Sequence, residues 1–575
     1  MSFSKQSLWQ RFWRVAKPYW VSEERRGAYA LLGVLLLLTI ASSGLLVLET
    51  FPIGEIISAL AAQDYPRLAQ AVGFFIAIAL LSIPIFALKS FVRDRLGLYW
   101  RRWLTHSFLA QYFHPQAFYP LHNDPAIDNP DQRISEDIRA VTQESLYFLI
   151  AMFDAVLQFA AFVGILWSIS PTLMGVLLGY AGLSTWLTVS VFGPTLTTIN
   201  FEQLKQEANF RFGLVRVRNH AEAIAFYRGQ TRESMQSQQR FRHVFQNFNR
   251  LIRWQFRLNL FQNGYQYLTL LLPILVLAPR ILANDLELGA VTQSQIAFER
   301  IGFTLGLVIH QFSQLSALAA GVDRLDTLQR VAQSAVSPEE SRGSDRPSPE
   351  TITFFEDSHL ALQNLTLHTP NYLSTLVRQL SITVPVGSSL LITGASGVGK
   401  SSLLRAIAGL WKTGSGHITC PPYKTMLFLP QRPYVTLGSL REQLLYPNLT
   451  QDVADEQLLS VLQQVNLPHL AKQFSGLEAI EDWEQVLSEG EQQRLAFARL
   501  LLTQPRYALL DEATSALDIS NEALLYQQLQ QSGMTYISVG HRVSLLPYHD
   551  FVLELMPDQT WKLTPTEQSA LHSNL

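Results

Sequence analysis

The sequence has one cysteine, Cys420, among its 575 residues, and only 16% of its residues are charged. A single cysteine excludes an intrachain disulfide and a cysteine-rich metal site. Soluble proteins carry about 25% charged residues, so this low fraction, together with 48% hydrophobic residues, indicates a membrane protein. The length excludes a single compact domain, because a domain holds roughly 150 residues.

The sequence also lacks the pattern of a cleavable signal peptide. Its first 26 residues are basic and aromatic, and the first apolar run is far longer than the apolar core of a signal. We expect residues 1–26 to form an amphipathic segment on the membrane surface, and the alternative is an ordinary aromatic-rich helix flank. The aromatic residues of this segment are Trp9, Phe12, Trp13, Tyr19 and Trp20.

Six apolar windows of about 20 residues, enough to cross a bilayer, predict an all-α membrane domain over residues 27–330. They lie near 27–49, 68–88, 146–169, 171–195, 259–279 and 301–322. Basic residues concentrate in the long polar stretch 202–257, so the positive-inside rule predicts that the two long loops face the cytoplasm.

The two long loops have apolar residues at helical spacing, which predicts helices that continue past the membrane. Each loop is interrupted, the first by prolines between Pro120 and Pro130 and the second by Gly229. Turns there predict short segments near 121–135 and 218–232 that would meet a cytoplasmic domain.

Polar residues inside the spans are candidate functional residues, because each costs free energy in lipid unless it faces a cavity or a partner. Asp154 lies in the third window and His310 in the sixth. For both, a helix–helix hydrogen bond is the alternative. Glu299 and Arg300 are neighbours near the sixth window, and we expect them to form an ion pair with each other.

Residues 331–350 are rich in serine, proline and charge, which is typical of a linker. Beyond it, residues 351–575 alternate short β-like runs with helical stretches, the pattern of an α/β domain. No internal repeat is present. The chain is therefore expected to hold an N-terminal segment, a membrane domain, a linker and a soluble α/β domain.

A phosphate-binding loop carries the strongest signal. Residues 390–407, LLITGASGVGKSSLLRAI, place the pattern G-x-x-x-x-G-K-[ST] between a strand and a helix, the context that this loop requires. Backbone N–H groups and the helix N-terminus would bind phosphates, Lys400 would reach the β and γ phosphates, and Ser401 would bind Mg²⁺. The expected contacts are Gly394, Ala395, Ser396, Gly397, Val398, Gly399, Lys400, Ser401 and Ser402.

An acidic pair follows a second apolar strand in RYALLDEATSALD. Asp511 and Glu512 stand at the carboxyl end of that strand, where ligands bind in open α/β sheets. Asp511 would hold Mg²⁺, and Glu512 would orient and deprotonate the attacking water of phosphoryl transfer. A solvated turn is the alternative for the pair taken alone.

These motifs stand in order with FLPQRPY, LSEGEQQR and YISVGHR, and the set resembles the nucleotide-binding domain of ATP-binding cassette (ABC) transporters. With the six spans ahead of it, the whole chain resembles an exporter-type half-transporter, which implies an ATP hydrolase coupled to transport, with ATP and Mg²⁺ bound by a P-loop domain. The resemblance also implies a homodimer. Ser488 and Gly490 would then contact the γ-phosphate of ATP held by the other subunit.

The resemblance implies three further roles. Gln431 would contact Mg²⁺ and sense the membrane domain, and Asp518 would lie in a loop that communicates between sites. His541 would bind the γ-phosphate and brace Glu512. Two departures are visible: the usual LSGGQ reads LSEGE, and Thr369 stands where an aromatic residue usually stacks on adenine, with Tyr372 as a possible substitute.

Segments 126–138 and 207–230 resemble the branch that holds peroxisomal subfamily D half-transporters and bacterial SbmA/BacA-type proteins. That branch implies a lipid-like acyl compound, a cobalamin-like cofactor or a peptide as cargo, and it leaves the direction of transport open. We expect a multi-pass protein of a bacterial plasma membrane with a cytoplasmic nucleotide-binding domain and no nucleic-acid partner. An ATP-gated channel or regulator is the alternative function, whereas six spans exclude a soluble mechanical ATPase.

Overall fold

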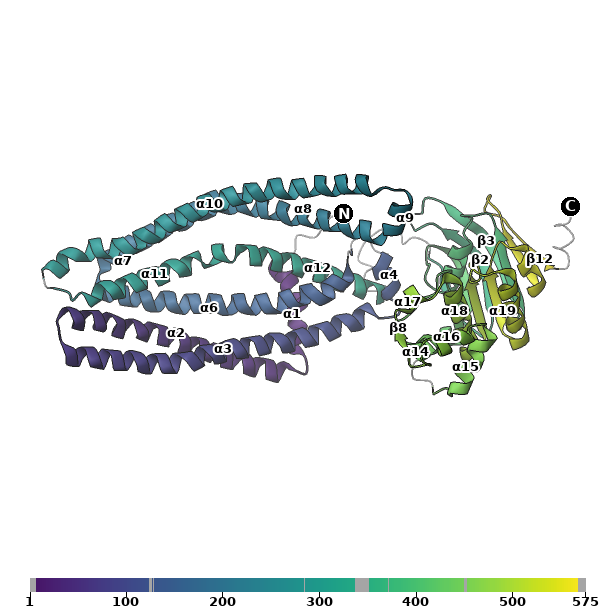
Figure 1. Ribbon diagram of the computed structural model, residues 1–575, viewed down its shortest axis with the longest axis horizontal. Coiled ribbons are helices and arrows are strands. Elements are labelled where there is room, and N and C mark those ends of the chain that lie inside the picture. Colours follow the sequence, from purple (N-terminus) through teal and green to yellow (C-terminus); the bar gives the residue numbers. More distant parts are fainter. Residues whose placement is uncertain are drawn as a thin grey trace. The chain divides into compact units, whose positions relative to one another are not determined.

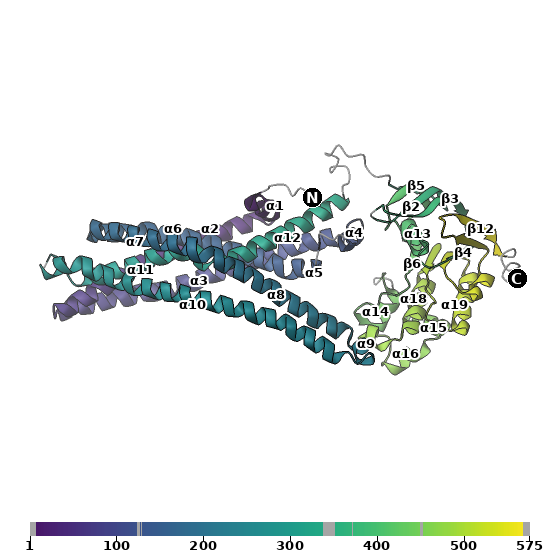
Figure 2. The same ribbon diagram turned by 90° about the horizontal axis from the view of Figure 1, so that it is seen from above.

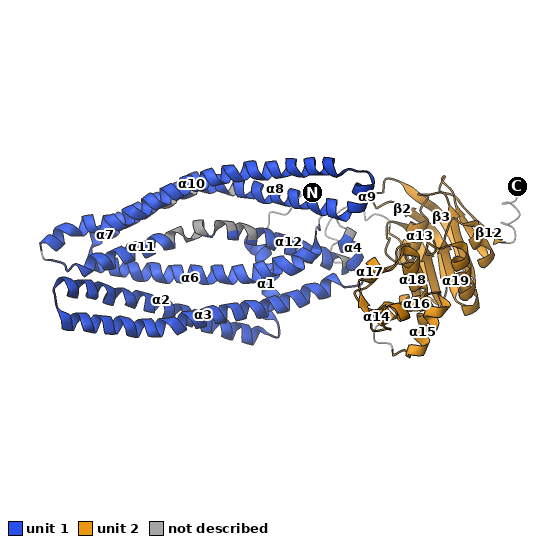
Figure 3. Cartoon of the chain, viewed as in Figure 1, with its two compact units in different colours: residues 1–343 blue, residues 344–575 orange. Residues whose placement is uncertain are grey.

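The computed structural model describes residues 7–123, 127, 129–283, 285–336, 351–370, 372–448 and 452–566. For some residues within helices, including 305–310, it gives the backbone without a described side chain. The chain divides into two compact units, residues 1–343 and 344–575, coloured separately in Figure 3.

The first unit is helical (Figure 1). Its helices are α1 (Leu8–Val21), α2 (Arg25–Ala61), α3 (Tyr65–Tyr112), α4 (Phe118–Asn123), α5 (Pro130–Gln132), α6 (Ile138–Ile169), α7 (Pro171–Leu187), α8 (Gly193–Asn219), α9 (Ala221–Phe226), α10 (Gln230–Leu282), α11 (Gly289–His310) and α12 (Phe312–Val336). Single π-helical turns at Arg133–Asp137 and Thr188–Phe192 join neighbouring helices. α12 continues to Val336, inside the segment whose composition predicts a linker.

Four helical segments of the described chain are long and apolar enough to cross a membrane. They are Arg25–Ala61, Tyr65–Tyr112, Pro130–Ile169 and Gln230–Leu282. The count of six is therefore not reproduced. The fourth predicted window begins in α7, whose apolar stretch is shorter, and the sixth is divided between α11 and α12 at Gln311.

The longest helices extend well beyond a bilayer. α3 has 48 residues and α10 has 53. At 1.5 Å per residue they measure about 70 and 80 Å, against a hydrocarbon core of about 30 Å. Their length agrees with the helical spacing in the two long loops.

Short helices interrupt the two long loops where the sequence predicts breaks. In the second loop, α8 and α10 lie side by side and α9 joins them at one end (Figures 1 and 2). Gly229 precedes the first residue of α10. In the first loop, α4 and α5 flank residues 124–126 and 128, which lie outside the described residues, so the segment near 121–135 is described only in part.

α1 is held to α12 by ion pairs. A capping box between Ser7 and Gln10 begins α1. Arg14 Nη1 lies 2.7 Å from Asp326 Oδ1, and Arg11 pairs with Asp323. The opposite face of α1 exposes Trp9 and Trp13, whose rings stack at 6.1 Å.

The second unit is built around two sheets. β1 (Thr353–Glu356), β5 (Gly414–Cys420), β2 (Leu360–His368) and β3 (Thr375–Val384) form a four-stranded sheet in this order. The six-stranded sheet has the order β12 (Trp561–Pro565), β11 (Phe551–Leu555), β4 (Ser389–Gly394), β10 (Thr535–Val539), β9 (Tyr507–Asp511) and β6 (Met426–Leu429). All its pairings are parallel except that of β11 with β12.

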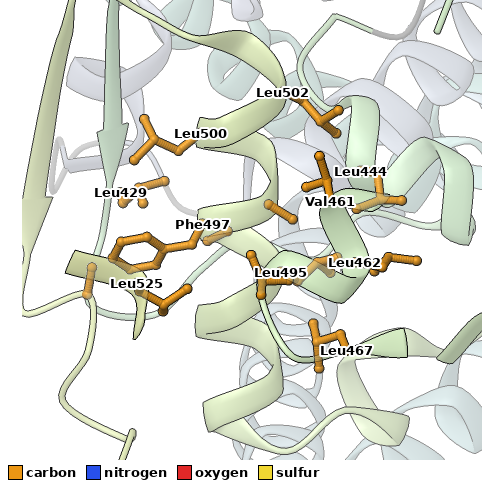
Figure 4. Close-up of a cluster of buried hydrophobic side chains, with 14 of the residues drawn as sticks. Leu429, Leu444, Val461, Leu462, Leu467, Leu495, Phe497, Leu500, Leu502 and Leu525 are labelled. Carbon is orange, nitrogen blue, oxygen red and sulfur yellow. The ribbon is translucent and has the colours of Figure 1, made fainter. Parts of the chain in front are cut away.

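Helices α13 (Lys400–Ile407), α14 (Leu440–Leu445), α15 (Asp455–Gln464), α16 (Pro468–Gln473), α17 (Trp483–Val486), α18 (Glu489–Thr503) and α19 (Ile519–Ser532) complete the unit, with a short ribbon of β7 (Gly438–Ser439) and β8 (Ile480–Glu481). Figure 4 shows the buried cluster that fixes α18. In that cluster Leu495 and Phe497 of α18 pack with side chains of α14, α15 and β6. The N-terminus of α18, with the LSEGE motif, is thereby anchored to the sheet.

Candidate functional site

Four adjacent strands deliver four of the sequence motifs. In the order β4, β10, β9, β6, the strands run parallel, so their carboxyl ends share one edge of the sheet. The phosphate loop follows β4, and His541 follows β10. Asp511 is the last residue of β9 and Glu512 comes directly after it, and Gln431 follows β6. This edge is where open parallel sheets bind ligands, and it brings together motifs that are up to 147 residues apart, from Gly394 to His541.

The phosphate loop has the backbone that its glycines permit. Gly394, Gly397 and Gly399 have positive φ angles of 135°, 85° and 105°, which only glycine adopts without strain. A Cβ at Gly394 would also lie 2.2 Å from the Leu555 carbonyl oxygen. The loop leads directly into α13, which starts at Lys400.

Lys400 is buried within this loop, with 6% of the residue exposed. Its Nζ donates to the carbonyl oxygens of Gly394 at 3.0 Å and Ala395 at 2.8 Å. Burial lowers the pKa of Lys400, while the nearby charges of Glu512 and Asp511 act in the opposite direction. The ammonium group thus lies inside the loop, close to the acidic pair.

The residues assigned to Mg²⁺ fit that ion. Ser401 Oγ donates to Asp511 Oδ1 at 2.8 Å, so a hydroxyl and a carboxylate converge on one point. Mg²⁺ prefers such hard oxygen ligands and takes few of them from the protein. Among the described residues there is no cluster of three or more His, Cys, Asp or Glu that would form a protein-only metal cage.

Two side chains, those of Gln431 and His541, converge on Glu512. Its Oε2 accepts a hydrogen bond from Gln431 Nε2 at 2.8 Å, and its Oε1 lies 3.6 Å from His541 Nε2. Glu512 has φ +49°, a left-handed conformation that is costly for a residue with a side chain. Its N–H donates to the Val539 carbonyl oxygen of β10, which holds the turn beside the strand that leads to His541.

The LSEGE motif caps α18. Ser488 is the N-cap, and its hydroxyl donates to Glu491 Oε2 at 2.7 Å while the Glu491 N–H donates back at 3.3 Å. Burial acts to raise the pKa of Glu491, but the hydrogen bonds from Ser488 and His469 outweigh it and hold that pKa below its usual range. The altered fifth residue of the motif therefore works as the acidic half of a capping box.

Ser488 and Gly490 make no hydrogen bond or ion pair with the phosphate loop of their own chain in the part that the structure describes. Gly490 is close to the segment after β9, where a Cβ would stand 3.2 Å from the Ala516 carbonyl oxygen. Asp518 caps α19, accepting from the Asn521 N–H at 2.8 Å. That backbone hydrogen bond lowers the pKa of Asp518.

Gln493 is a residue that sequence reasoning missed. It is 3% exposed, and its Nε2 donates to the Gln431 carbonyl oxygen at 3.2 Å and to Ser515 Oγ at 3.1 Å. Its Oε1 accepts from the Ala516 N–H at 3.0 Å. One amide therefore joins α18 to the segments that carry Gln431 and the acidic pair. The only signal in the sequence was a polar residue on the buried face of a helix.

The hairpin between β2 and β3 holds the residues considered for adenine stacking. Thr369 forms a turn there with Tyr372, whose N–H donates to the Thr369 carbonyl oxygen at 2.8 Å. Tyr372 is 42% exposed, and its ring lies 5.7 Å from that of His368. His368 directly precedes Thr369 and is a second aromatic ring at this position, which the sequence analysis did not consider.

Two candidates in the membrane unit have different outcomes. Asp154 pairs with Lys89, and its Oδ1 accepts from Ser43 Oγ at 2.6 Å, so it lies in a helix–helix contact among α2, α3 and α6. The side chain of His310 lies outside the described residues.

Comparison with known proteins identifies both units. Residues 13–282 match the family model of the ABC transporter transmembrane region 2, and residues 377–515 match that of the ABC transporter domain. An uncharacterised ABC transporter ATP-binding protein of Synechocystis sp. is 46% identical over 94% of this chain and 82% of its own length.

Two named relatives extend over nearly the whole chain. The chloroplastic ABC transporter D family member 2 of Arabidopsis thaliana is 37% identical over 99% of this chain and 90% of its own length. The lysosomal cobalamin transporter ABCD4 of Homo sapiens is 31% identical over 96% of both chains. The chain therefore belongs to the ABC transporter family, in its subfamily D type, as a membrane protein that fuses a transmembrane region to an ATPase domain and couples ATP hydrolysis to transport.

Proposed function

We propose that the protein is a homodimeric transporter in which two copies complete two ATP sites between them. The observation that supports the catalytic part is the convergence of Gln431 and His541 on Glu512, beside the phosphate loop. Glu512 is the general base for the attacking water, because a carboxylate at this position can accept a proton in phosphoryl transfer. His541 braces Glu512 and contacts the γ-phosphate.

Phosphate and metal binding use the remaining residues of the edge. The loop Gly394–Ser402 binds the phosphates through backbone N–H groups, and Lys400 leaves its carbonyl partners to reach the β and γ phosphates. Ser401, Asp511 and Gln431 hold Mg²⁺, whose charge offsets that of the phosphates. Tyr372 or His368 stacks on adenine.

The composite site follows from the position of the LSEGE motif. Ser488 and Gly490 stand at the N-terminus of the 15-residue helix α18, where backbone N–H groups and the helix dipole favour an anion. Within their own chain these residues make no hydrogen bond to the described part of the phosphate loop. In the dimer they contact the γ-phosphate bound by the other copy, and Asp518 communicates between the two sites.

The membrane unit of each copy contributes six spans. Four of them are the long apolar helices, α7 with α8 supplies another, and α11 with α12 supplies the last. The basic residues of 202–257 support a cytoplasmic position for α9 and the nucleotide-binding domain, with α1 on the membrane surface. The segments near 121–135 and 218–232 couple the two domains. We assign the protein to a bacterial plasma membrane.

The cargo is a lipid-like acyl compound, a cobalamin-like cofactor or a peptide. One relative is named a lysosomal cobalamin transporter, which supports the second of these. To test for transport, we would reconstitute the wild type or Glu512→Gln into proteoliposomes and add cobalamin, palmitoyl coenzyme A or a short peptide. ATP-dependent accumulation above the external concentration, in the wild type only, supports a transporter. Equilibration without accumulation would instead support an ATP-gated channel.

The shared site is tested with two inactive chains. Lys400→Ala removes phosphate binding, and Gly490→Asp puts a carboxylate where the γ-phosphate binds. In a mixed dimer, one site has both lesions and the other has neither, so nucleotide trapping should return in dimers purified by two different tags. If each chain completed its own site, confirmed mixed dimers would trap no more nucleotide than either mutant homodimer. A melting curve of Gly490→Asp controls for its close contact with Ala516.

A further inference from the structure

Two groups of charged side chains lie between the spans, and they differ in their partners. The first is the Lys89–Asp154 pair, in which Lys89 Nζ also donates to Ser42 Oγ at 3.2 Å and Asp154 accepts from Ser43. Every charge in this group has an opposite charge and a hydroxyl partner. Such pairing is the usual way to lower the cost of an ionisable group in a membrane.

The second group is unpaired. Glu49 on α2 and Glu299 and Arg300 on α11 line a pocket of about 360 Å³. In the described part of the chain, none of these three side chains makes an ion pair or a hydrogen bond, so Glu299 and Arg300 do not pair with each other as the sequence suggests. Apolar residues and Thr50 form the other walls, namely Leu46, Thr50, Ile53, Ile296 and Phe303.

The pocket lies well below the short-loop end of the helices. Glu49 is six residues before Glu55, about 9 Å along the helix. At the level of Glu55, Arg67 Nη2 bridges to Glu55 at 3.1 Å and to Glu287 at 2.6 Å. These charges mark the polar end of the helices. The unpaired charges lie further along the helices from that end, where Glu49 is partly exposed and Glu299 and Arg300 are exposed in the single chain.

Backbone contact separates the pocket from that polar end. A Cβ on Gly289 would lie 2.1 Å from the Gly54 carbonyl oxygen, and the Gly289 N–H donates to Ser58 Oγ at 3.1 Å. α2 and α11 thus touch through glycines between the pocket and the loops.

The pocket's charges define the chemistry of its occupant. Arg300 presents a forked donor that suits a carboxylate or phosphate, whereas Glu49 and Glu299 suit an ammonium group. With two carboxylates to one guanidinium, a polyanionic group would meet net repulsion. We propose, building on the proposed transport function, that this pocket binds the polar part of the cargo and that this part is zwitterionic, with an ammonium group and an anionic group next to an apolar body.

A peptide with free termini and a zwitterionic phospholipid share this chemistry. The peptide probes are Leu-Phe with both termini free, and its N-acetyl, C-amide and doubly blocked forms, offered to the protein in a non-ionic detergent. The lipid probes are lysophosphatidylethanolamine and the anionic lysophosphatidylglycerol. Stimulation of ATPase activity should be strongest for the zwitterion of whichever series is recognised.

One single and one double variant then assign the roles of the positive and negative charges. Arg300→Gln should raise the half-maximal concentration of the zwitterion about tenfold, as for one lost charged hydrogen bond, and leave the response to the C-amide peptide unchanged. Glu49→Gln with Glu299→Gln should do the same for the zwitterion but not for the N-acetyl peptide. Arg250→Gln, an exposed charge on α10, is the matched control and should change neither.

Each other outcome overturns the proposal. Equal stimulation by all forms, no stimulation by either series, or unchanged half-maximal concentrations in the variants would show that these charges do not select cargo. Loss of dimers in Arg300→Gln by size exclusion would show that the charges pair between copies instead. A wild type without basal ATPase activity or ATP-driven accumulation would contradict the proposed function itself, which is a separate result.

Discussion

Replacing Gln493 should lower the rate of ATP hydrolysis while the binding of ATP changes little. Its amide makes three hydrogen bonds, two of them to Gln431 and Ser515 and one from Ala516. Gln493→Leu keeps the approximate size of the side chain but removes all three. The Ala516 N–H then loses its partner in a buried place, which costs about 1–3 kcal/mol, and the two other bonds cost about 1 kcal/mol each.

The expected loss of stability is therefore about 3–5 kcal/mol, which for a domain of this size lowers the melting temperature by about 6–20 °C. The catalytic effect is separate. Gln431 loses the bond that fixes its backbone, so its hydrogen bond to Glu512 is no longer held, and about 1.4 kcal/mol lost in the transition state lowers kcat tenfold. KM for ATP should change little, because none of the hydrogen bonds that the structure describes for Gln493 goes to the phosphate loop.

Gln492→Leu is the matched control. Gln492 directly precedes Gln493 in α18, and its amide also donates two hydrogen bonds, to the carbonyl oxygens of Glu484 at 3.1 Å and Leu487 at 3.0 Å. Neither of these partners lies in the segments that contain Gln431 and the acidic pair. The measurements are melting curves, kcat and KM for ATP. The reasoning fails if kcat falls equally in both variants, or if Gln493→Leu is destabilised with normal kcat.

Three further predictions use other parts of the structure. Glu512→Gln should keep ATP binding but lose hydrolysis by about 10²–10⁴-fold, as for other single catalytic groups, and near-normal turnover in a phosphate-release assay would refute its role as base. Glu222→Ala, an exposed change on α9, should abolish ATP-driven accumulation in proteoliposomes while basal ATPase activity stays; parallel loss of both would indicate misfolding. Burial lowers the pKa of His549 to about 4, whereas a histidine in the unfolded chain has a pKa near 6.5. The free energy of unfolding should therefore fall by on the order of 3 kcal/mol as the pH is lowered from about 6.5 to 4. Melting curves should show a smaller fall for His549→Gln.

The motifs of the nucleotide-binding domain could be predicted because each is a local pattern with a local structure. The phosphate loop, for example, needs a strand, a run of glycines and a helix, all within residues 390–407, and the structure has β4, three positive φ angles and α13 there. The convergence of Gln431, Glu512 and His541 could be expected only from the resemblance. It depends on the order of strands in the sheet, which no single segment specifies.

The membrane unit was harder to predict for a physical reason. Apolar windows report composition, whereas the four long apolar helices of the structure are also unbroken, and the sixth window is interrupted at Gln311 between α11 and α12. The partner of Asp154 is Lys89, 65 residues away on another helix. Such pairs are set by how helices pack, and the sequence at either position contains no trace of the other.

Several side chains assigned to ATP binding already make hydrogen bonds within the chain, and these bonds limit what each side chain can add to the affinity for ATP. Lys400 donates to two loop carbonyls, Ser401 to Asp511, and Ser488 to Glu491. Phosphate binding must therefore exchange existing hydrogen bonds for charge-assisted ones, and only the difference between them adds to affinity. The gain is greatest for Lys400, which gives up neutral carbonyls for a charged phosphate. It is smallest for Ser401 and Ser488, which already donate to carboxylates.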